Sequence, residues 1–333
     1  MKPLALVGCA HIHTPDFIRK ISARKDVKLA SVWDHDPARS KKIAEQTGAT
    51  AVDDLQRICG DSNIDAAIVC TETNLHEKVV LPLAAAKKNL FVEKPLGFSS
   101  ADARVMAVAI EKAGVIFQTG YAMRGDSKIL FLKQQVDSGR FGKITRVRGS
   151  TCHSGALGRW FDTDYRWMAD PKIAGCGAFG DLGTHSLDIL LWMFGDVSAV
   201  TAQLDPGTAA YPGCDETGEA MLRFKSGVIG TLAAAWDDVA NPVSLLISGT
   251  EGHAAIISGQ LHFQSKQIAG YDGTQPLRTA ELPLALNAGL DAFLDAVAGL
   301  PAALVSVREA AYRSTVMEAM YQAAREGKWV KPG

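Results

Sequence analysis

The sequence predicts an α/β fold with an N-terminal Rossmann-like, doubly wound parallel sheet and a C-terminal α+β domain with a large, mostly antiparallel sheet. Two observations predict it. In the first third, short aliphatic or β-branched runs alternate with helical stretches, which is typical of a parallel sheet covered by helices. After about residue 120, a glycine- and tryptophan-rich segment is followed by strand-like runs with short connections, which favour antiparallel strands. We therefore expect two domains, at residues 1–120 and 121–333.

Six runs are the candidate strands of the first domain. They are residues 4–8, 27–33, a weak run at 49–52, 66–70, 90–92 and 115–118. Between them, the apolar stripes at 17–21, 43–44 and 79–84 predict helices that cover the sheet.

The second domain contains four further strand-like runs, at residues 199–204, 220–224, 228–236 and 243–248. The short connection Lys225-Ser226-Gly227 predicts a hairpin. Near the end, Ser306 and Glu309 form a capping-box pattern, so we expect a helix that begins there and ends before Gly327.

Composition points to a protein that binds a small molecule. The chain has 333 residues, of which 47% are hydrophobic, and its 35 basic and 36 acidic residues give a formal net charge of -1. This balance gives no electrostatic reason to expect nucleic acid or an anionic membrane as partner. No apolar stretch approaches the roughly 20 residues that cross a bilayer. Six cysteines without a C-x-x-C pair indicate reduced thiols of a cytoplasmic protein.

The first strand ends in a degraded dinucleotide fingerprint. The fingerprint has glycine at its first, third and sixth positions, but only Gly8 is present, and Ala10 and His13 occupy the other two. Thr14 before Pro15 predicts that the helix starts late, with Thr14 as its cap. His11 and His13 could donate to a phosphate in place of backbone N–H groups, or merely line a turn. The H-x-H spacing alone does not predict a metal site, and we expect none.

Asp34 closes the second strand, close to the offset after Gly8 at which an acid accepts hydrogen bonds from the adenosine ribose. A carboxylate there repels a 2′-phosphate and favours NAD over NADP, although Arg39 and Lys41 keep NADP open. A second interpretation is that Asp34 begins the turn that leads to Pro37.

Lysine, aspartate and histidine form a candidate proton-transfer set. Lys94 follows the apolar run 89–92, at the strand end where open α/β sheets bind ligands. Asp181 and His185 are four residues apart, so a helix places them on one face, with Asp188 beside them. The alternatives are a solvated lysine and a surface hydrogen bond between the other two.

Five motifs in order resemble one family. They are Asp34 with Asp36-Pro37, Thr71-Glu72-Thr73-Asn74-Leu75-His76, Glu93-Lys94-Pro95, Gly139-Arg140-Phe141-Gly142-Lys143-Ile144 and Asp181-Leu182-Gly183-Thr184-His185. With them, nearly the whole chain is similar to the Gfo/Idh/MocA family, the glucose-fructose oxidoreductase and inositol dehydrogenase group. The resemblance implies that residues 1–120 form a dinucleotide-binding domain and that residues 121–333 form a larger sheet domain for substrate binding and oligomerisation. It also implies a homodimer or homotetramer.

The resemblance also implies roles for residues. Lys94 would lie beside the nicotinamide and the reacting carbon, and His185 would exchange the hydroxyl proton, for which its pKa suits it. Asp181 would hold the imidazole or bond the sugar. The cofactor contacts that it implies, together with the altered loop, are Gly8, Ala10, His11, Ile12, His13, Asp34, Arg39, Thr71, Asn74, His76, Glu93 and Lys94.

Two positions in the loop that begins at Thr71 need comment. Asn74 could instead cap the helix that starts there. Glu72 stands where relatives commonly have proline, and would bring an unexpected negative charge close to the cofactor.

Aromatic and cationic residues near these motifs are the candidate substrate contacts. Hydroxyl-rich ligands use several donors and an aromatic face, and a carboxylate favours arginine. A solvated basic loop is the alternative for each residue. Besides Lys94, Asp181 and His185, the candidates are Tyr121, Arg124, His153, Arg159, Tyr165 and Arg166, with Trp160 and Lys172 nearby.

Together these features predict an NAD(P)-dependent oxidoreductase that acts on a secondary hydroxyl, or the matching ketone, of a sugar, sugar derivative or cyclitol. Two alternatives remain open. One is a glycosidase or lyase that uses NAD for a transient oxidation, and the other is a non-catalytic regulator that senses nucleotide or sugar.

Overall fold

The computed structural model describes residues 1–333 and divides into two compact units. The first unit consists of Met1–Ala122, Phe161–Gly175 and Asn287–Ser314. The second consists of Met123–Trp160, Cys176–Leu286 and Thr315–Gly333. Each unit thus joins segments that are far apart in the sequence, and each is described by itself below.

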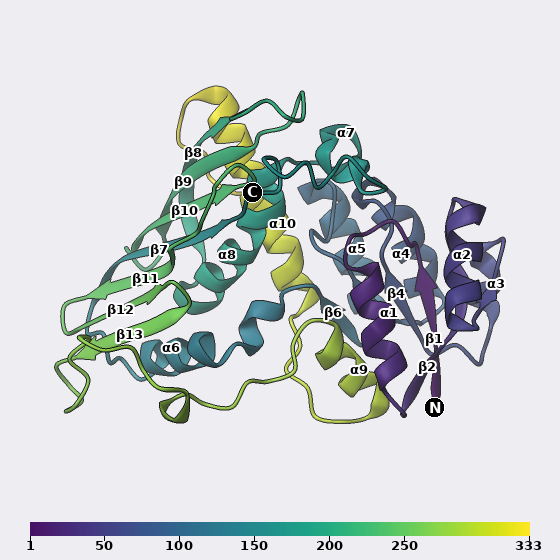
Figure 1. Ribbon diagram of the computed structural model, residues 1–333, viewed down its shortest axis with the longest axis horizontal. Helices are drawn as coiled ribbons and strands as arrows, with labels where there is room; N and C mark the ends of the chain where they lie inside the picture. The colour runs from purple at the N-terminus through teal and green to yellow at the C-terminus, as the bar shows by residue number, and fades with distance from the viewer. The chain divides into compact units, whose positions relative to one another are not determined.

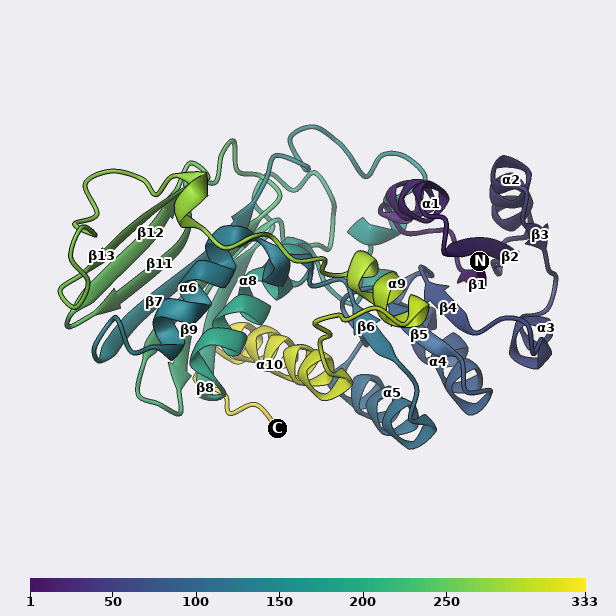
Figure 2. The ribbon, with the colours of Figure 1, turned by 90° about the horizontal axis from the view of Figure 1, so that it is seen from below.

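The first unit, which contains the N-terminus (Figure 1), is built on a six-stranded sheet, sheet A, in the order β3-β2-β1-β4-β5-β6 (Figure 2). All of its neighbouring strands are parallel. The strands are β1 Lys2–Val7, β2 Val27–Trp33, β3 Thr50–Ala51, β4 Ala66–Val69, β5 Asn89–Val92 and β6 Phe117–Thr119. The six predicted runs and the doubly wound fold are therefore confirmed. The strand order reverses between β1 and β4, and such sheets bind ligands at the carboxyl ends of the strands there.

Helices cover both faces of sheet A. They are α1 Thr14–Ala23, α2 Pro37–Thr47, α3 Leu55–Gly60, α4 His76–Ala85, α5 Ser100–Ala113 and α9 Leu290–Ala298. Leu4 and Leu6 enter one core, with Phe17 of α1 and Phe293 of α9. The alternate residues Ala5 and Val7 belong to a second core with side chains of α4 and α5. Because both faces are buried there, the central strands β1, β4 and β5 contain continuous apolar runs. The sequence did not predict α3, α5 and α9. The short elements η1 Thr73–Leu75, η3 Arg166–Ala169 and α7 Pro171–Ala174 complete the unit.

The second unit is built on a seven-stranded sheet, sheet B, in the order β13-β12-β11-β7-β10-β9-β8. Its strands are β7 Ile144–Cys152, β8 Val197–Asp205, β9 Thr217–Phe224, β10 Ile229–Ala235, β11 Val243–Gly249, β12 Gly252–Ile257 and β13 Gln260–Ser265. Only β7 and β10 pair in parallel. The predicted hairpin joins β9 and β10, and Gly227 takes a φ of 89° in its turn. The sequence analysis missed β7, β12 and β13.

A buried helix, α8 Ala178–Phe194, packs against β7, β9 and β10, along one face of sheet B (Figure 2). Close packing needs a glycine on β7, since a Cβ at Gly149 would lie 3.1 Å from the Cβ of Ser186. The remaining elements are η2 Ala122–Gly125, α6 Ser127–Asp137, η4 Thr279–Glu281 and α10 Val307–Glu326. The predicted capping box of α10 is confirmed, because Ser306 N donates to Glu309 Oε2 at 3.0 Å and Glu309 N to Ser306 Oγ at 3.2 Å. None of the helices combines the length and apolarity that crossing a membrane requires.

Candidate active site

The loop after β1 lies against the start of the loop after β4. Gly8 has a φ of 85°, and a Cβ there would lie 2.4 Å from the backbone nitrogen of Thr71, so only glycine fits. Helix α1 begins late, as predicted, but its N-cap is His13 and no side chain caps it. The prediction that Thr14 caps this helix is wrong. The His13 side chain does not cap the helix, because its ring is hydrogen-bonded to Glu93.

Asp34 is buried at the end of β2 and accepts two backbone hydrogen bonds. Its Oδ2 accepts from Cys9 N at 2.6 Å, and its Oδ1 accepts from Asp36 N at 2.8 Å. The second bond confirms that Asp34 begins the turn toward Pro37. The first bond links Asp34 to the loop after β1. The contact of Asp34 with an adenosine ribose stays a prediction beside this structural role.

Arg39 on α2 bridges two acidic side chains. Its Nη2 lies 3.0 Å from Asp34 Oδ1 and donates to Glu72 Oε1 at 2.9 Å. Burial acts to lower the pKa of Arg39, but the hydrogen bond to Glu72 and the charges of both carboxylates outweigh it and raise that pKa. Arg39 therefore offsets the negative charge that Glu72 brings to the site.

A cavity of about 270 Å³ opens in the first unit beside this group. It is lined by Cys9, Ala10, Thr14, Pro15, Arg39, Lys42, Ile43, Gln46, Asp164 and Tyr165. Tyr165, predicted as a substrate contact, thus shares a cavity with the predicted cofactor residues Ala10 and Arg39. The buried atoms Arg39 Nε and Glu72 Oε2 make no hydrogen bond and could still serve a ligand.

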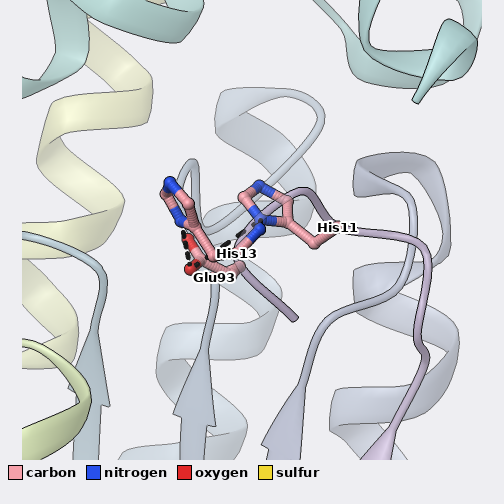
Figure 3. Close-up of side chains that lie close together, drawn as sticks. All are labelled: His11, His13 and Glu93. Atoms are coloured by element: carbon pink, nitrogen blue, oxygen red, sulfur yellow. Dashed lines mark hydrogen bonds and ion pairs between the residues drawn. The ribbon is translucent and has the colours of Figure 1, made fainter. Parts of the chain in front are cut away.

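Glu93, at the end of β5, gathers the two histidines of the first loop (Figure 3). Its Oε1 lies 2.9 Å from His13 Nδ1 and 3.9 Å from His11 Nδ1. Burial alone would raise the pKa of Glu93, but the two histidines and Lys94 hold that pKa well below its usual range. Both histidines thus lie beside the Glu93 carboxylate, and their contact with a phosphate stays a prediction.

Tryptophan from a distant segment supports the same loop. The Trp167 ring lies 6.0 Å from that of His11, and its Nε1 donates to Ala10 O at 3.0 Å. Ile12 between the histidines is half-buried.

Lys94 is buried directly after β5, and its backbone N donates to Glu93 Oε2 at 2.9 Å. The peptide bond to Pro95 is cis. A Cβ at Gly120 would lie 2.8 Å from Glu93 Oε2 and 3.2 Å from Lys94 Cγ, so glycine leaves room for both side chains. Glu93 therefore fixes the backbone at Lys94.

The segment after β4 contributes two buried polar side chains. Thr71 Oγ1 and His76 Nε2 have no hydrogen-bond partner, whereas His76 Nδ1 bonds Leu96 O at 3.1 Å. Burial lowers the pKa of His76, so its imidazole is neutral. Asn74 is exposed within η1, and the N-cap of α4 is Leu75. The interpretation of Asn74 as a helix cap is wrong.

In the second unit, α8 leaves two polar positions partly accessible. All its residues are buried except Asp181, His185 and Trp192. The Asp181 carboxylate accepts from Trp236 Nε1 at 3.1 Å, which fixes its orientation. Asp188 faces elsewhere, because it is buried and bonded twice by Arg124, at 2.8 and 2.6 Å. Asp181 and His185 thus form the accessible pair.

The other predicted substrate residues are placed in several surroundings. Arg124 also lies 5.2 Å from the Trp192 ring, and Tyr121 is buried after β6. His153 Nδ1 accepts from Gly155 N, and its ring lies 4.8 Å from that of Trp160 at an interplanar angle of 34°. Arg159 Nη1 donates to Ala210 O at 2.7 Å. Arg166 makes an exposed pair with Asp162, and Lys172 lies in α7. Their contact with substrate stays a prediction.

Comparison with known proteins decides the family. A family model described as "Oxidoreductase family, NAD-binding Rossmann fold" matches residues 3–121, and the "GFO/IDH/MocA C-terminal domain" matches residues 129–255. The chain belongs to the Gfo/Idh/MocA family of NAD-binding oxidoreductases.

Individual relatives in this family are distant. Myo-inositol 2-dehydrogenase of Thermotoga maritima is 31% identical over 214 residues, which are 62% of this chain and 60% of the relative. Levoglucosan dehydrogenase of Pseudarthrobacter phenanthrenivorans is 25% identical over 71% of this chain and 64% of its own length. The matches therefore span less than two thirds of these relatives. A solved levoglucosan dehydrogenase, in complex with NADH and L-sorbose, has a TM-score of 0.86 at 20% identity and covers 100% of this chain and 99% of that one. This likeness confirms the fold.

The residues at the carboxyl edge of sheet A fit an NAD cofactor, which the family description names. Gly8 lets the backbone of the first loop approach Thr71, whose hydroxyl is left without a partner. Sequence reasoning missed Trp167, Lys42 and Gln46 around this site, and Trp236 beside Asp181. Each comes from a segment whose own pattern carries no sign of the partner it meets.

Proposed function

We propose that this protein is an NAD-dependent oxidoreductase that acts on a secondary hydroxyl, or the matching ketone, of a sugar, sugar derivative or cyclitol. The observation that carries the proposal is the carboxyl edge of sheet A. Gly8, Asp34, Thr71 and Lys94 follow four different strands there, in the order that a dinucleotide site requires. The relatives support the substrate class, since their names specify an inositol and an anhydrosugar.

Residues of the first unit hold the cofactor in this proposal. The loop Gly8–His13 faces the pyrophosphate, Asp34 accepts from the adenosine ribose, and Thr71 with His76 serves the nicotinamide end. NAD is preferred to NADP because the Asp34 carboxylate would repel a 2′-phosphate and Arg39 is already paired with Asp34 and Glu72. When bound, NAD supplies the hydride acceptor or donor.

The proton is handled by side chains of the protein. Oxidation of an alcohol requires removal of the hydroxyl proton as the carbonyl forms, and His185 accepts that proton. Lys94 donates a hydrogen bond to the oxygen on which charge develops. Asp181, held by Trp236, positions the imidazole of His185 or bonds a neighbouring hydroxyl of the substrate. Tyr121, His153, Arg159, Tyr165 and Arg166 are the candidate contacts to the remaining hydroxyls.

The proposal extends to assembly and location. Sheet B presents exposed apolar side chains, among them Met221, Ile229 and Ile257, which suits a homodimer or homotetramer formed on that sheet. All six cysteines are free thiols, which suits the cytoplasm.

A turnover screen tests the proposal. The purified protein is mixed with NAD and a panel of cyclitols, sugars and anhydrosugars, and formation of NADH is followed by absorbance. We expect turnover of at least one panel member, with kcat reduced by about 10²–10⁴ in Lys94→Ala and in His185→Ala. The matched controls are Lys112→Ala and His253→Ala, which change exposed residues of the first and second unit.

Two outcomes would replace the proposal. Conversion of a sugar without net NADH, abolished by Lys94→Ala, would indicate a transient oxidation during cleavage or elimination. Normal ligand binding by Lys94→Ala and His185→Ala, with no reaction in the unmodified protein, would indicate a regulator.

A further inference from the structure

The first loop and the end of β5 bring together three side chains that can bind a metal. His11, His13 and Glu93 each offer one ligand atom, and these atoms lie within 4.8 Å of one another (Figure 3). We propose that they form a binding site for a divalent transition-metal ion of the zinc class. The site does not depend on the proposed oxidoreductase activity.

The donor set suits such an ion. Two imidazole nitrogens and one carboxylate oxygen are ligands that Zn²⁺, Co²⁺ and Fe²⁺ accept. Metal–ligand bonds of about 2.0–2.2 Å put neighbouring donor atoms roughly 3.0–3.5 Å apart. The separations from Glu93 Oε1, 2.9 Å to His13 and 3.9 Å to His11, bracket that range. All three ligand atoms lie within 4.8 Å of one another, so the two rings would move toward each other and toward Glu93 Oε1 to bind one ion.

Surrounding contacts already orient the ligands. The Glu93 side chain is fully buried, and its second oxygen accepts the backbone N–H of Lys94. His11 is 3% exposed and lies beside the Trp167 ring. Fixed ligands with outer hydrogen bonds are what metal sites have. The His13 side chain is 44% exposed, so it leaves a path by which the ion can enter.

Binding changes two hydrogen bonds in a defined way. A neutral imidazole that coordinates through Nδ1 carries its proton on Nε2, so the Nδ1–Glu93 hydrogen bond of His13 is given up when the metal takes the Nδ1 lone pair and the carboxylate oxygen. The hydrogen bond from His13 N to His11 Nδ1, 3.2 Å long, is also given up. Three protein ligands leave at least one position for water or another ligand.

Cobalt provides a direct test. The full-length protein is treated with a chelator, dialysed and titrated with Co²⁺, and the visible d–d absorption is recorded. Zn²⁺ binding is measured in parallel by calorimetry. We expect one equivalent to bind, and affinity to fall at least tenfold in His13→Ala and in Glu93→Gln. The matched control His253→Ala, an exposed histidine of β12, keeps full affinity.

Three results would overturn the proposal. They are no binding of Co²⁺ or Zn²⁺, binding that is unchanged in His13→Ala, and binding lost equally in His253→Ala. Thermal unfolding checks that each variant is folded. If Glu93→Gln, which changes a buried residue, is not folded, the result with His13→Ala alone decides. Titration of the same samples with NADH separates this proposal from the proposed function, because NADH binding does not require the metal.

Discussion

Arg39 should stabilise the first unit by holding two buried carboxylates together. Its Nη2 lies 3.0 Å from Asp34 and 2.9 Å from Glu72, whose side chains are 0% and 11% exposed. Arg39→Leu removes the cation and leaves both negative charges in place. Breaking a buried pair in this way costs about 3–5 kcal/mol. The Arg39 side chain is 26% exposed, and His35 lies 3.4 and 3.6 Å from the two acids, so we expect about 2–3 kcal/mol.

The double variant makes this prediction specific. Glu72→Gln keeps an acceptor for Arg39 and removes one charge, so it should cost roughly 1 kcal/mol or less. In Arg39→Leu with Glu72→Gln, only Asp34 stays charged, and roughly 1 kcal/mol of the loss should return. Unfolding in urea is monitored by hydrogen exchange in peptides from β1 and β2, which reports on the first unit. An effect of Arg39→Leu below about 0.5 kcal/mol, or strictly additive costs, would refute the reasoning.

Three further predictions follow from single sites. Asp34→Ser should weaken NADH binding and strengthen NADPH binding about tenfold or more, since it removes the carboxylate that repels a 2′-phosphate and leaves Arg39 with Glu72 as its remaining close acidic partner; unchanged relative affinities in fluorescence titrations would count against it. Gly8→Ala should lower the free energy of unfolding by about 3 kcal/mol or more, because its Cβ meets the Thr71 backbone at 2.4 Å; a urea midpoint equal to that of the parent protein would contradict this. Burial, with the charge of Asp238, raises the pKa of Cys152 to about 11, so the thiol is neutral at pH 8. Its alkylation rate, measured by mass spectrometry, should therefore rise roughly tenfold per pH unit from 8 to 10. A rate that levels off near pH 9 would show an ordinary thiol.

The sequence predicted the first unit well because its signals are local. Each strand of sheet A is a short apolar run, and residues such as Asp34 and Lys94 directly follow one. Sheet B was harder, because β7 pairs in parallel with β10, which lies far along the chain. Nothing in the run 144–152 indicates that partner.

Long-range partners explain what the sequence left open at the site. The H-x-H pattern alone predicted no metal site, and Glu93, which completes the cluster, lies 80 residues beyond His13. The same applies to Glu72, whose charge looked unfavourable until Arg39, 33 residues earlier, was found beside it. Asp181 and His185 were recognisable from their helical spacing, but Trp236 was not. Pairing across a fold depends on three-dimensional packing, which single-segment patterns do not record.

Nucleotide binding is the step on which the account depends, because the first loop keeps only one fingerprint glycine. The most direct measurement is titration of the purified protein, checked to be free of nucleotide, with NADH and separately with NADPH, following nicotinamide fluorescence. The account predicts micromolar binding of NADH and much weaker binding of NADPH. No binding of either nucleotide by the folded protein would contradict it.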